Sequence, residues 1–227
     1  PPNRIPFQCE LITPEMLSLV TLEQENINNI VRQISGGAKN IQDIYPLTPF
    51  QEGILFHHLM SSDGDPYLLS SLLTFDTRDG LESFLSALQA VIERHDILRT
   101  AVLWEELPEP VQVVLRKIVL PITEVETDIA LGDAAKQLQA KYDPRCFRLD
   151  VRQAPLLRGY ITWDAIQKRW LLLILEHHLA LDHVAMEVLL REVQAHLLGQ
   201  FNQLAEPLPF RNFVAQTRMG KKLEEHE

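Results

Sequence analysis

Residues 176–183, EHHLALDH, place three histidines and an aspartate directly after an unbroken apolar run. A neutral imidazole can accept a proton near neutral pH, and a neighbouring carboxylate can orient it. The same residue types also bind metal ions, or simply face water at the end of a strand. The segment therefore raises three alternatives: a metal site, a general base with its supports, or ordinary surface polarity.

A metal site would have to use His177, His178, Asp182 and His183 as ligands. His177 and His178 are expected to end a strand, and neighbouring strand residues point to opposite faces of the sheet. Two such side chains cannot easily reach one ion. We therefore expect no metal here.

Simple surface polarity accounts for Asp182, which is well placed to cap the helix that follows. It does not account for both histidines, because one of them must face the core and needs a hydrogen-bond partner there. A general base at the end of a central strand fits better, with Asp182 ordering the loop and held ionised by an arginine. No Ser or Cys nucleophile lies beside it, so direct acyl transfer or proton abstraction is the expected chemistry.

Two helices with clear starts precede this segment. The first is expected from Thr21, which forms a capping-box pattern with Gln24, to Gly36. The second begins with Thr48 as its N-cap, followed by Pro49 and by Gln51.

The rest of the chain mixes hairpins with helices. Strands are expected at 67–76, 97–104, 110–116, 155–164 and 169–178, and helices at 81–96, 133–142 and 183–199. The run 169–178 is apolar on both faces and is therefore expected to be central. The pattern predicts an α/β (α+β) fold with a mixed, largely antiparallel sheet covered by helices.

Composition limits the partners. With 21 basic and 31 acidic residues the formal charge is -10, which repels nucleic acid and anionic membranes. Four arginines could still form a local cluster for a phosphorylated ligand, although a solvated basic edge is the favoured interpretation: Arg145, Arg148, Arg152 and Arg158. Cys9 and Cys146 are expected to be free thiols in a reducing cytoplasm. No membrane span or export signal is apparent.

Three ordered motifs resemble those of a known family. HHLALD resembles the HHxxxD core of the condensation domains of nonribosomal peptide synthetases, which share a fold with chloramphenicol acetyltransferase. YPLTPFQEGILFH and RHDILRT resemble the first and second motifs of that family, and the resemblance covers roughly residues 44–218. It implies His178 as the catalytic residue, Asp182 as a structural carboxylate paired with Arg94 or Arg99, and His177 as a support from the other face.

A further segment narrows the resemblance. HHLMSSDGD, residues 57–65, matches the HH[I/L]xxxxGD motif of dual domains, which invert the α-carbon of an upstream thioester before condensing it. The match implies roles for His57 and His58, whose imidazoles we expect near the cleft. An ordinary condensation domain and a non-catalytic docking lobe remain alternatives. His183 stands where the commonest family pattern has glycine.

The resemblance also implies an organisation. Residues 1–43 are expected to be a linker after a carrier domain, with one helix and a proline-rich, extended start over residues 1–20, and 44–227 an N-terminal lobe. No cofactor is expected to bind directly, because the substrates ride on the 4′-phosphopantetheine of neighbouring carrier domains. The expected partners are the upstream and downstream carriers and a second lobe, without which this lobe should be inactive.

Overall fold

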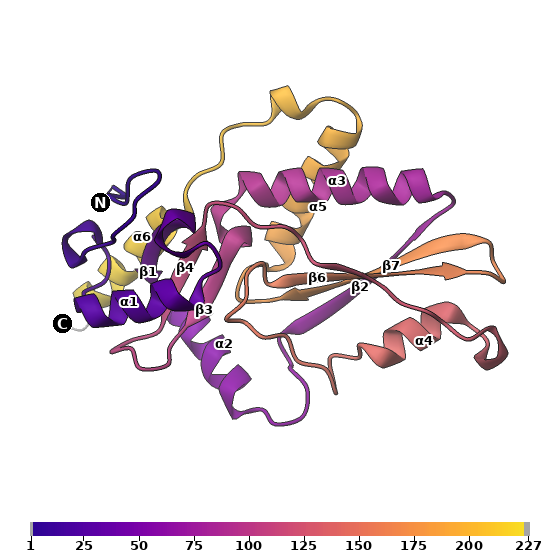
Figure 1. Cartoon of the computed structure of the whole chain (residues 1–227), viewed down its shortest axis with the longest axis horizontal. Coiled ribbons are helices and arrows are strands. Elements are labelled where there is room, and N and C mark those ends of the chain that lie inside the picture. Colours follow the sequence, from indigo (N-terminus) through magenta and orange to yellow (C-terminus); the bar gives the residue numbers. More distant parts are fainter. Residues whose placement is uncertain (1, 225–227) are drawn as a thin grey trace.

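The computed structural model describes residues 2–224, and describes side chains as far as residue 218. Two sheets lie side by side along the long axis of the molecule (Figure 1). The first has the strand order β1-β4-β3, and the second has the order β2-β7-β6-β5. The strands are β1 (Ile41–Pro46), β2 (Leu68–Phe75), β3 (Thr100–Leu103), β4 (Val111–Leu115), β5 (Ile122–Glu124), β6 (Leu157–Asp164) and β7 (Arg169–His177).

Helices cover both sheets. They are α1 (Gln24–Gln33), α2 (Pro49–Met60), α3 (Arg78–Arg94), α4 (Ala134–Lys141), α5 (His183–Leu197) and α6 (Phe210–Glu224). Figure 1 shows α3 and α5 on one face of the second sheet and α4 on the other, while α1 and α6 lie with the first sheet. The α/β fold with largely antiparallel strands is confirmed, and its strands are divided between two sheets.

Strand β7 is interior and apolar on both faces, as predicted. Leu171, Leu173 and Leu175 pack in the cluster that includes residues of α2 and α4. Leu172 and Ile174 pack in the cluster formed with α3 and α5. Because side chains alternate along a strand, this register places His177 on the α2 side and Glu176 on the α3 and α5 side.

Both expected hairpins form. Strand β3 pairs antiparallel with β4, and β6 pairs antiparallel with β7. Strand β5 runs parallel to β6, which makes the second sheet mixed.

The two helix starts have different outcomes. In α2, Thr48 accepts from the backbone N–H of Gln51 and the Gln51 side chain accepts from that of Thr48, so the predicted capping box is confirmed. In α1 the predicted cap at Thr21 is wrong, because Glu23 is the N-cap and forms its capping box with Asn26. Thr21 with Gln24 and Glu23 with Asn26 both have the three-residue spacing of a capping box, so the spacing alone does not distinguish the two positions.

The N-terminal segment belongs to the core. Ile5, Ile12 and Leu17 are buried with Ile27 and Ile30 in one cluster against the first sheet. The expectation of an extended connector over residues 1–20 is therefore wrong. The expected boundary between residues 43 and 44 falls inside β1.

Helix α6 lies beyond the last predicted helix and returns to the first sheet. Val214 packs in a small cluster with Tyr45 and Val114. The helices expected from the sequence end with the one at 183–199.

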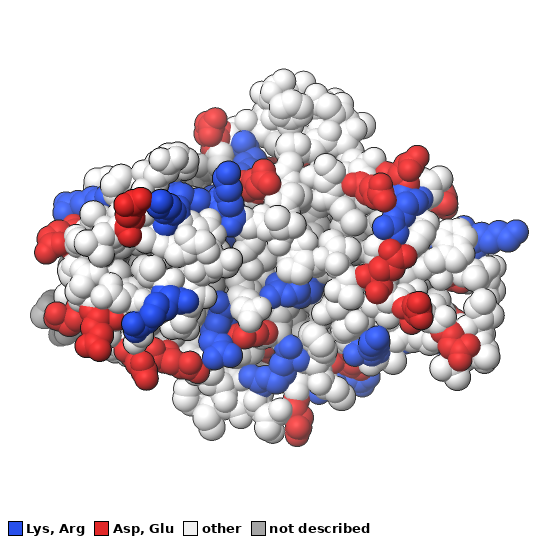
Figure 2. Space-filling model, viewed as in Figure 1, with Lys and Arg blue, Asp and Glu red and all other residues white. Residues whose placement is uncertain are grey.

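Surface charge is mixed. Basic and acidic side chains are interspersed over most of the face shown in Figure 2. Among residues 2–224, no helix is long and apolar enough to span a bilayer. Cys9 is buried, Cys146 is exposed, and both are free thiols.

Candidate functional site

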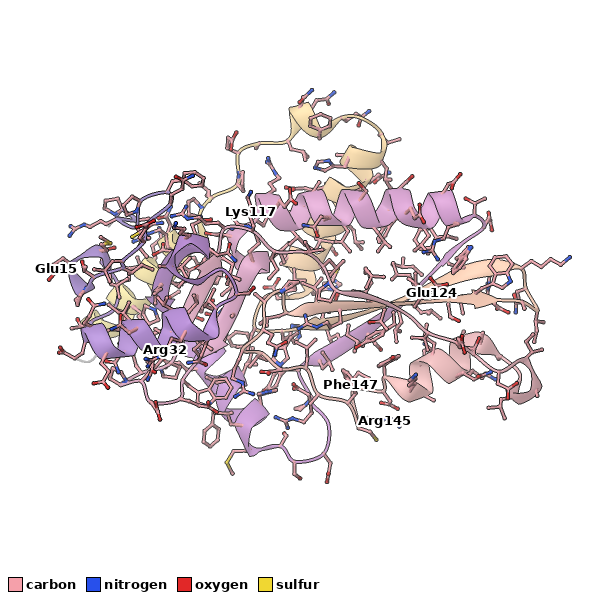
Figure 3. All side chains as sticks on the ribbon, in the orientation of Figure 1. Glu15, Arg32, Lys117, Glu124, Arg145 and Phe147 are labelled. Atoms are coloured by element: carbon pink, nitrogen blue, oxygen red, sulfur yellow. The ribbon has the colours of Figure 1, made fainter. Side chains whose placement is uncertain are left out.

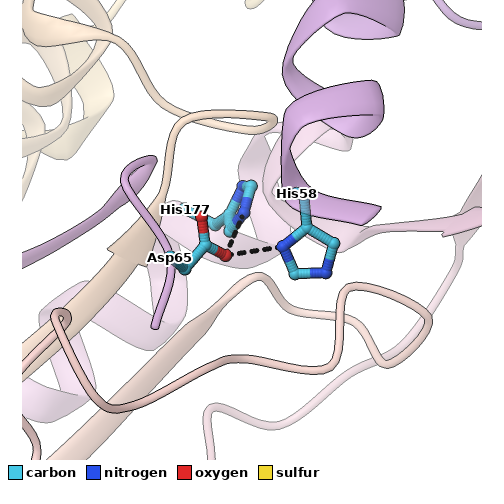
Figure 4. A group of neighbouring side chains, drawn as sticks. All are labelled: His58, Asp65 and His177. Carbon is cyan, nitrogen blue, oxygen red and sulfur yellow. Dashed lines mark hydrogen bonds and ion pairs between the residues drawn. The ribbon is translucent and has the colours of Figure 1, made fainter. Parts of the chain in front are cut away.

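A buried carboxylate joins the two histidine motifs. Figure 4 shows Asp65 between His58, at the end of α2, and His177, at the end of β7. One oxygen of Asp65, Oδ2, lies 2.6 Å from Nδ1 of His58 and 3.0 Å from Nε2 of His177. All three residues are buried.

The hydrogen bonds fix the protonation of this triad. The backbone N–H of Leu179 donates to Nδ1 of His177 at 3.1 Å, so the imidazole proton must lie on Nε2, from which it donates to Asp65. Burial opposes ionisation of Asp65, but hydrogen bonds from His177 and His58 hold the pKa of this carboxyl well below its usual value. Burial lowers the pKa of His177, which favours the neutral ring.

His58, Asp65 and His177 are also close enough together to be considered as metal ligands, since one donor atom of each lies within 4.8 Å of the others. A metal ion would have to replace the proton on Nε2 of His177, while Nδ1 of that ring is already engaged by a backbone N–H. The donor set therefore suits a proton-filled hydrogen-bond network better than an ion. His177 and His178 point to opposite sides, as predicted.

His178 is half-buried and has the opposite tautomer. Its Nδ1 lies 2.7 Å from the carbonyl oxygen of Leu181, and only an Nδ1–H can donate there. The lone pair is left on Nε2, the atom a general base needs. The backbone N–H of His178 donates to the carbonyl of Tyr67 at 2.9 Å, which extends the β2–β7 ladder by one residue.

The two pairs of adjacent histidines, His57–His58 and His177–His178, each have one buried member and one more exposed member. His58 and His177 form the buried layer, while His57 is exposed and His178 half-buried. The ring of Tyr67 is close to both members of this outer pair, with its centroid 6.0 Å from that of His57 and 6.4 Å from that of His178. Both helix imidazoles were expected near the cleft; the ring of His58 is buried against Asp65, and only that of His57 is exposed.

Contacts with Arg145 and Arg148 hold the turn after α2 in place. Gly64 has φ +81°, and a Cβ there would overlap the backbone carbonyl of Arg145. The guanidinium of Arg148 donates to the carbonyls of His58, Ser61 and Gly64. Figure 3 places Arg145 between the end of α2 and α4. Glycine is required at this position because the backbone is left-handed and tightly packed.

The start of α2 also reaches the histidine loop. The Gln51 side chain donates to the carbonyl oxygen of Leu179 at 2.8 Å and bonds to Gln112 of β4. Gln51 therefore serves both as part of the capping box and as a tie between the first motif and the loop after His178.

The predicted ion pair of Asp182 with Arg94 or Arg99 is wrong. Asp182 is exposed and caps α5 by accepting from the N–H of Ala185 at 2.7 Å, which confirms the capping role. Arg94 instead pairs with Glu192 at 3.1 Å, ten residues along α5 from Asp182 and so about 15 Å away at 1.5 Å per residue. Arg99 donates to the side chain of Gln42 and to the carbonyl of Leu115.

The second motif therefore anchors α5 at its middle. Both Arg94 and His95 contact Oε2 of Glu192. His183, the residue in place of glycine, is 88% exposed and pairs with Glu187 at 3.3 Å. It lies in the first turn of α5, where its side chain is exposed to solvent.

The four arginines do not form one open cluster. Arg145 pairs with Asp143, and Arg152 pairs with Asp150 and Glu105. Arg158 donates to the carbonyls of Gln153, Pro155 and Leu157. Together with the Arg148 contacts above, these bonds assign the arginines to local structure.

Sequence reasoning missed Asp65 and Tyr67. Asp65 is the last letter of the 57–65 motif, but its place in a Ser/Asp/Gly stretch suggests only a turn residue. The signal that could have found it is the motif itself. The motif requires an aspartate at its last position, four residues after Ser61, whereas an ordinary turn does not need a buried aspartate there.

Comparison with known proteins agrees with this geometry. Residues 41–227 match the family described as "Condensation domain". Malpibaldin synthetase and malpinin synthetase, both from Mortierella alpina, are each 48% identical to all of this chain, which spans 4% and 3% of their lengths. A linear gramicidin synthase of Brevibacillus parabrevis is 30% identical over 209 residues, covering 89% of this chain and 4% of that protein.

Solved structures share the fold. The EpoB NRPS cyclization-docking bidomain from Sorangium cellulosum superimposes with a TM-score of 0.65 at 19% identity, over 81% of this chain and 36% of that one. SgcC5 from Streptomyces globisporus gives a TM-score of 0.55 at 23% identity, over 78% of this chain and 42% of that one.

Proposed function

The chain belongs to the condensation-domain family, and on that premise we propose that it supplies the histidine wall of a peptide-bond-forming site in a nonribosomal peptide synthetase. The substrates would be an acyl thioester on an upstream carrier and the amine of an aminoacyl group on a downstream carrier, each tethered through 4′-phosphopantetheine. The observation that carries the proposal is the hydrogen bond from Nδ1 of His178 to the carbonyl of Leu181, which places the lone pair of the neutral ring on Nε2.

The reaction requires two things of this side of the site. It must help to position the substrates, and it must provide one proton acceptor. The amine nitrogen adds to the thioester carbonyl, the C–N bond forms and the C–S bond breaks. Nε2 of His178 takes the proton that the nitrogen loses, and returns it to the departing thiolate. Because the thioester is already activated, holding the two tethered groups together contributes more to the rate than proton transfer does.

We propose further that the domain is of the dual kind and inverts the donor α-carbon before condensation. The support is the 57–65 motif, whose His58 and Asp65 contact His177 of the HHLALD segment. His57 remains in the outer layer with Tyr67 and His178. Inversion requires that the α-proton leave from one face and return to the other. Nε2 of His178 would remove it, and we propose that His57 acts on the opposite face.

The partners that we propose follow from how small a part of each relative this chain covers. Since this chain spans a small fraction of each relative, we propose the two carrier domains and the second lobe of the condensation domain as its partners. An ordinary condensation domain remains the second candidate, and it is favoured if the 57–65 motif serves only to hold His177.

The test uses the intact synthetase with deuterated solvent. His178→Ala should remove deuterium uptake at the donor α-carbon and reduce peptide formation by about 10²- to 10⁴-fold, the usual effect of losing a general base. Full deuterium uptake in this variant would show that another group is the base.

A separate variant distinguishes the dual domain from the ordinary one. His57→Ala should abolish inversion and leave peptide formation within about threefold, because His57 is exposed and holds no buried contact. If wild-type protein condenses but never exchanges the α-proton, the ordinary condensation domain is the correct assignment.

A further inference from the structure

Glu176 is a buried acid that nothing in the proposed chemistry uses. It precedes the two histidines on β7 and is 5% exposed. Its Oε2 is fully enclosed and has no hydrogen-bond partner among the residues that the structure describes. Buried carboxyl groups are normally hydrogen-bonded, so this one calls for an explanation.

The position of Glu176 places it beside the candidate base. The backbone hydrogen bond of His178 to Tyr67 continues the β2–β7 ladder one residue beyond β7, so alternation along the chain puts Glu176 and His178 on the same side, opposite to His177. Its cross-strand neighbours are apolar: Leu69 on β2 and Leu157 on β6. Burial raises the pKa of the Glu176 carboxyl, while the charge of His178, when present, opposes that rise.

The described residues around Glu176 provide no hydrogen-bond donor to its Oε2. Leu69 and Leu157 cannot donate a hydrogen bond, and the lone pair on Nε2 of His178 cannot donate to a carboxylate. A cation brought by a substrate would supply the missing partner, since an ammonium offers three donors and an opposite charge.

We propose that Glu176 receives the α-ammonium group of the acceptor substrate and holds it next to Nε2 of His178. This inference rests on the proposed condensation function. The acceptor amine is the cationic group that this reaction must bring within reach of His178, and a group within reach of His178 on this face is also near Glu176. Glu176 is thus a residue that positions the amine and selects amine over uncharged acceptors.

The proton balance is simple. The acceptor arrives as R–NH₃⁺ and donates hydrogen bonds to the Glu176 carboxylate. One proton passes to solvent, and the neutral amine then attacks the thioester carbonyl. The second proton, which the nitrogen loses on attack, passes to Nε2 of His178 and from there to the departing thiolate. Glu176 itself forms and breaks no covalent bond.

The experiment compares two acceptors in the intact synthetase. The acceptor carrier is loaded either with its own amino acid or with the matching α-hydroxy acid, and the hydroxyacyl carrier is used as a competitive inhibitor. Glu176→Gln should raise KM for the aminoacyl carrier about tenfold, as expected for loss of one charge-assisted hydrogen bond, while Ki for the uncharged hydroxyacyl carrier stays within about twofold. Glu176→Asp should recover part of the loss.

Glu187→Gln is the matched control, because Glu187 is an exposed carboxylate on α5 that pairs with His183 at the surface. It should change neither constant. Thermal unfolding of each variant checks that the fold is kept.

Two results would overturn the inference. Equal weakening of both carriers by Glu176→Gln would indicate a role in folding or carrier docking, for example through a basic residue of another lobe. Unchanged constants for both carriers would show that Glu176 does not meet the amine. Failure of the wild-type synthetase to join the two substrates would instead overturn the proposed function.

Discussion

The two histidines that end β7 have different environments, and their substitution should separate stability from activity. His177 is fully buried and hydrogen-bonded at both ring nitrogens, whereas His178 is half-buried and hydrogen-bonded at one. His177→Ala should lower the free energy of unfolding by about 3 kcal/mol or more, because it leaves a cavity and removes a donor to Asp65. His178→Ala should cost about 1 kcal/mol.

Urea unfolding of the two variants checks this difference. If His178→Ala were the more destabilised protein, the assignment of His177 as the structural histidine would fail. Comparable loss in both variants would mean that neither ring is free to serve the reaction.

Asp65 makes stability depend on pH in a definite direction. Its folded pKa is depressed, so it stabilises the fold above its unfolded pKa of about 4 and loses that contribution as pH falls toward the folded value. Asp65→Asn should therefore cost about 3 kcal/mol near pH 7, and the deficit should shrink as the pH is lowered below about 4.

The pH series needs a neighbouring acid as control. Asp63→Asn serves, since Asp63 lies two residues away in the same turn and is exposed. It should stay within about 0.5 kcal/mol of wild type at every pH. A deficit for Asp65→Asn that persists unchanged at low pH would mean that the residue acts through its shape and not through its charge.

At the scale of elements, the local signal at the start of α2 was correct and that at the start of α1 was off by two residues, while distant contacts could not be predicted. The start of α2 follows from Thr48, Pro49 and Gln51 because capping involves residues three apart. The bond from Asp65 to His177 joins positions 112 residues apart, and its existence depends on how α2 packs on β7. Spacing along the chain contains no information on that packing.

The error over Asp182 has the same origin. The family resemblance implied that Asp182 pairs with Arg94 or Arg99, but Arg94 contacts Glu192, which lies ten residues farther along the chain than Asp182. The capping role needed only the next three residues and was predicted correctly.

The turn that ends the 57–65 motif allows a test with two glycines. Gly64→Ala should destabilise the protein by about 1 to 3 kcal/mol from backbone strain alone, with added cost from the clash at Arg145. Gly53→Ala should stabilise it by about 0.5 to 1 kcal/mol, because Gly53 lies inside α2 with open space around its Cβ position.

The two changes differ only in location, so thermal unfolding of both proteins is a direct comparison. Gly64→Ala should also lower peptide formation, because the turn carries Asp65. If Gly64→Ala unfolds like wild type, the turn is not constrained as described.

At the scale of the whole molecule, the division into two sheets was not visible in the sequence. Hairpins and helices were predicted one by one, yet no pattern indicates that the β3–β4 hairpin joins β1 through β4 while the β6–β7 hairpin joins β2 through β7. The N-terminal segment shows the same limit. Its prolines suggested an extended connector, but Ile5 and Ile12 find a hydrophobic cluster that only the folded sheet provides.

The outer surface of α2 leads to a prediction about association. Phe56 is 60% exposed and Met60 is 71% exposed, and because they are four residues apart they lie on one face of the helix. Large apolar side chains gathered on a surface favour association. We expect the 227-residue chain to fold, to form no peptide on its own, and to associate increasingly with concentration in analytical ultracentrifugation.

A double variant identifies the surface responsible. Phe56→Ser with Met60→Gln should weaken association by about tenfold, because roughly 1.4 kcal/mol of apolar burial is lost from the contact. Leu208→Ser is the control, since Leu208 is 85% exposed and lies apart in the loop before α6. It should leave association unchanged. Loss of association in the control but not in the double variant would place the contact at the C-terminal side of the molecule, away from the helix that carries His57 and His58.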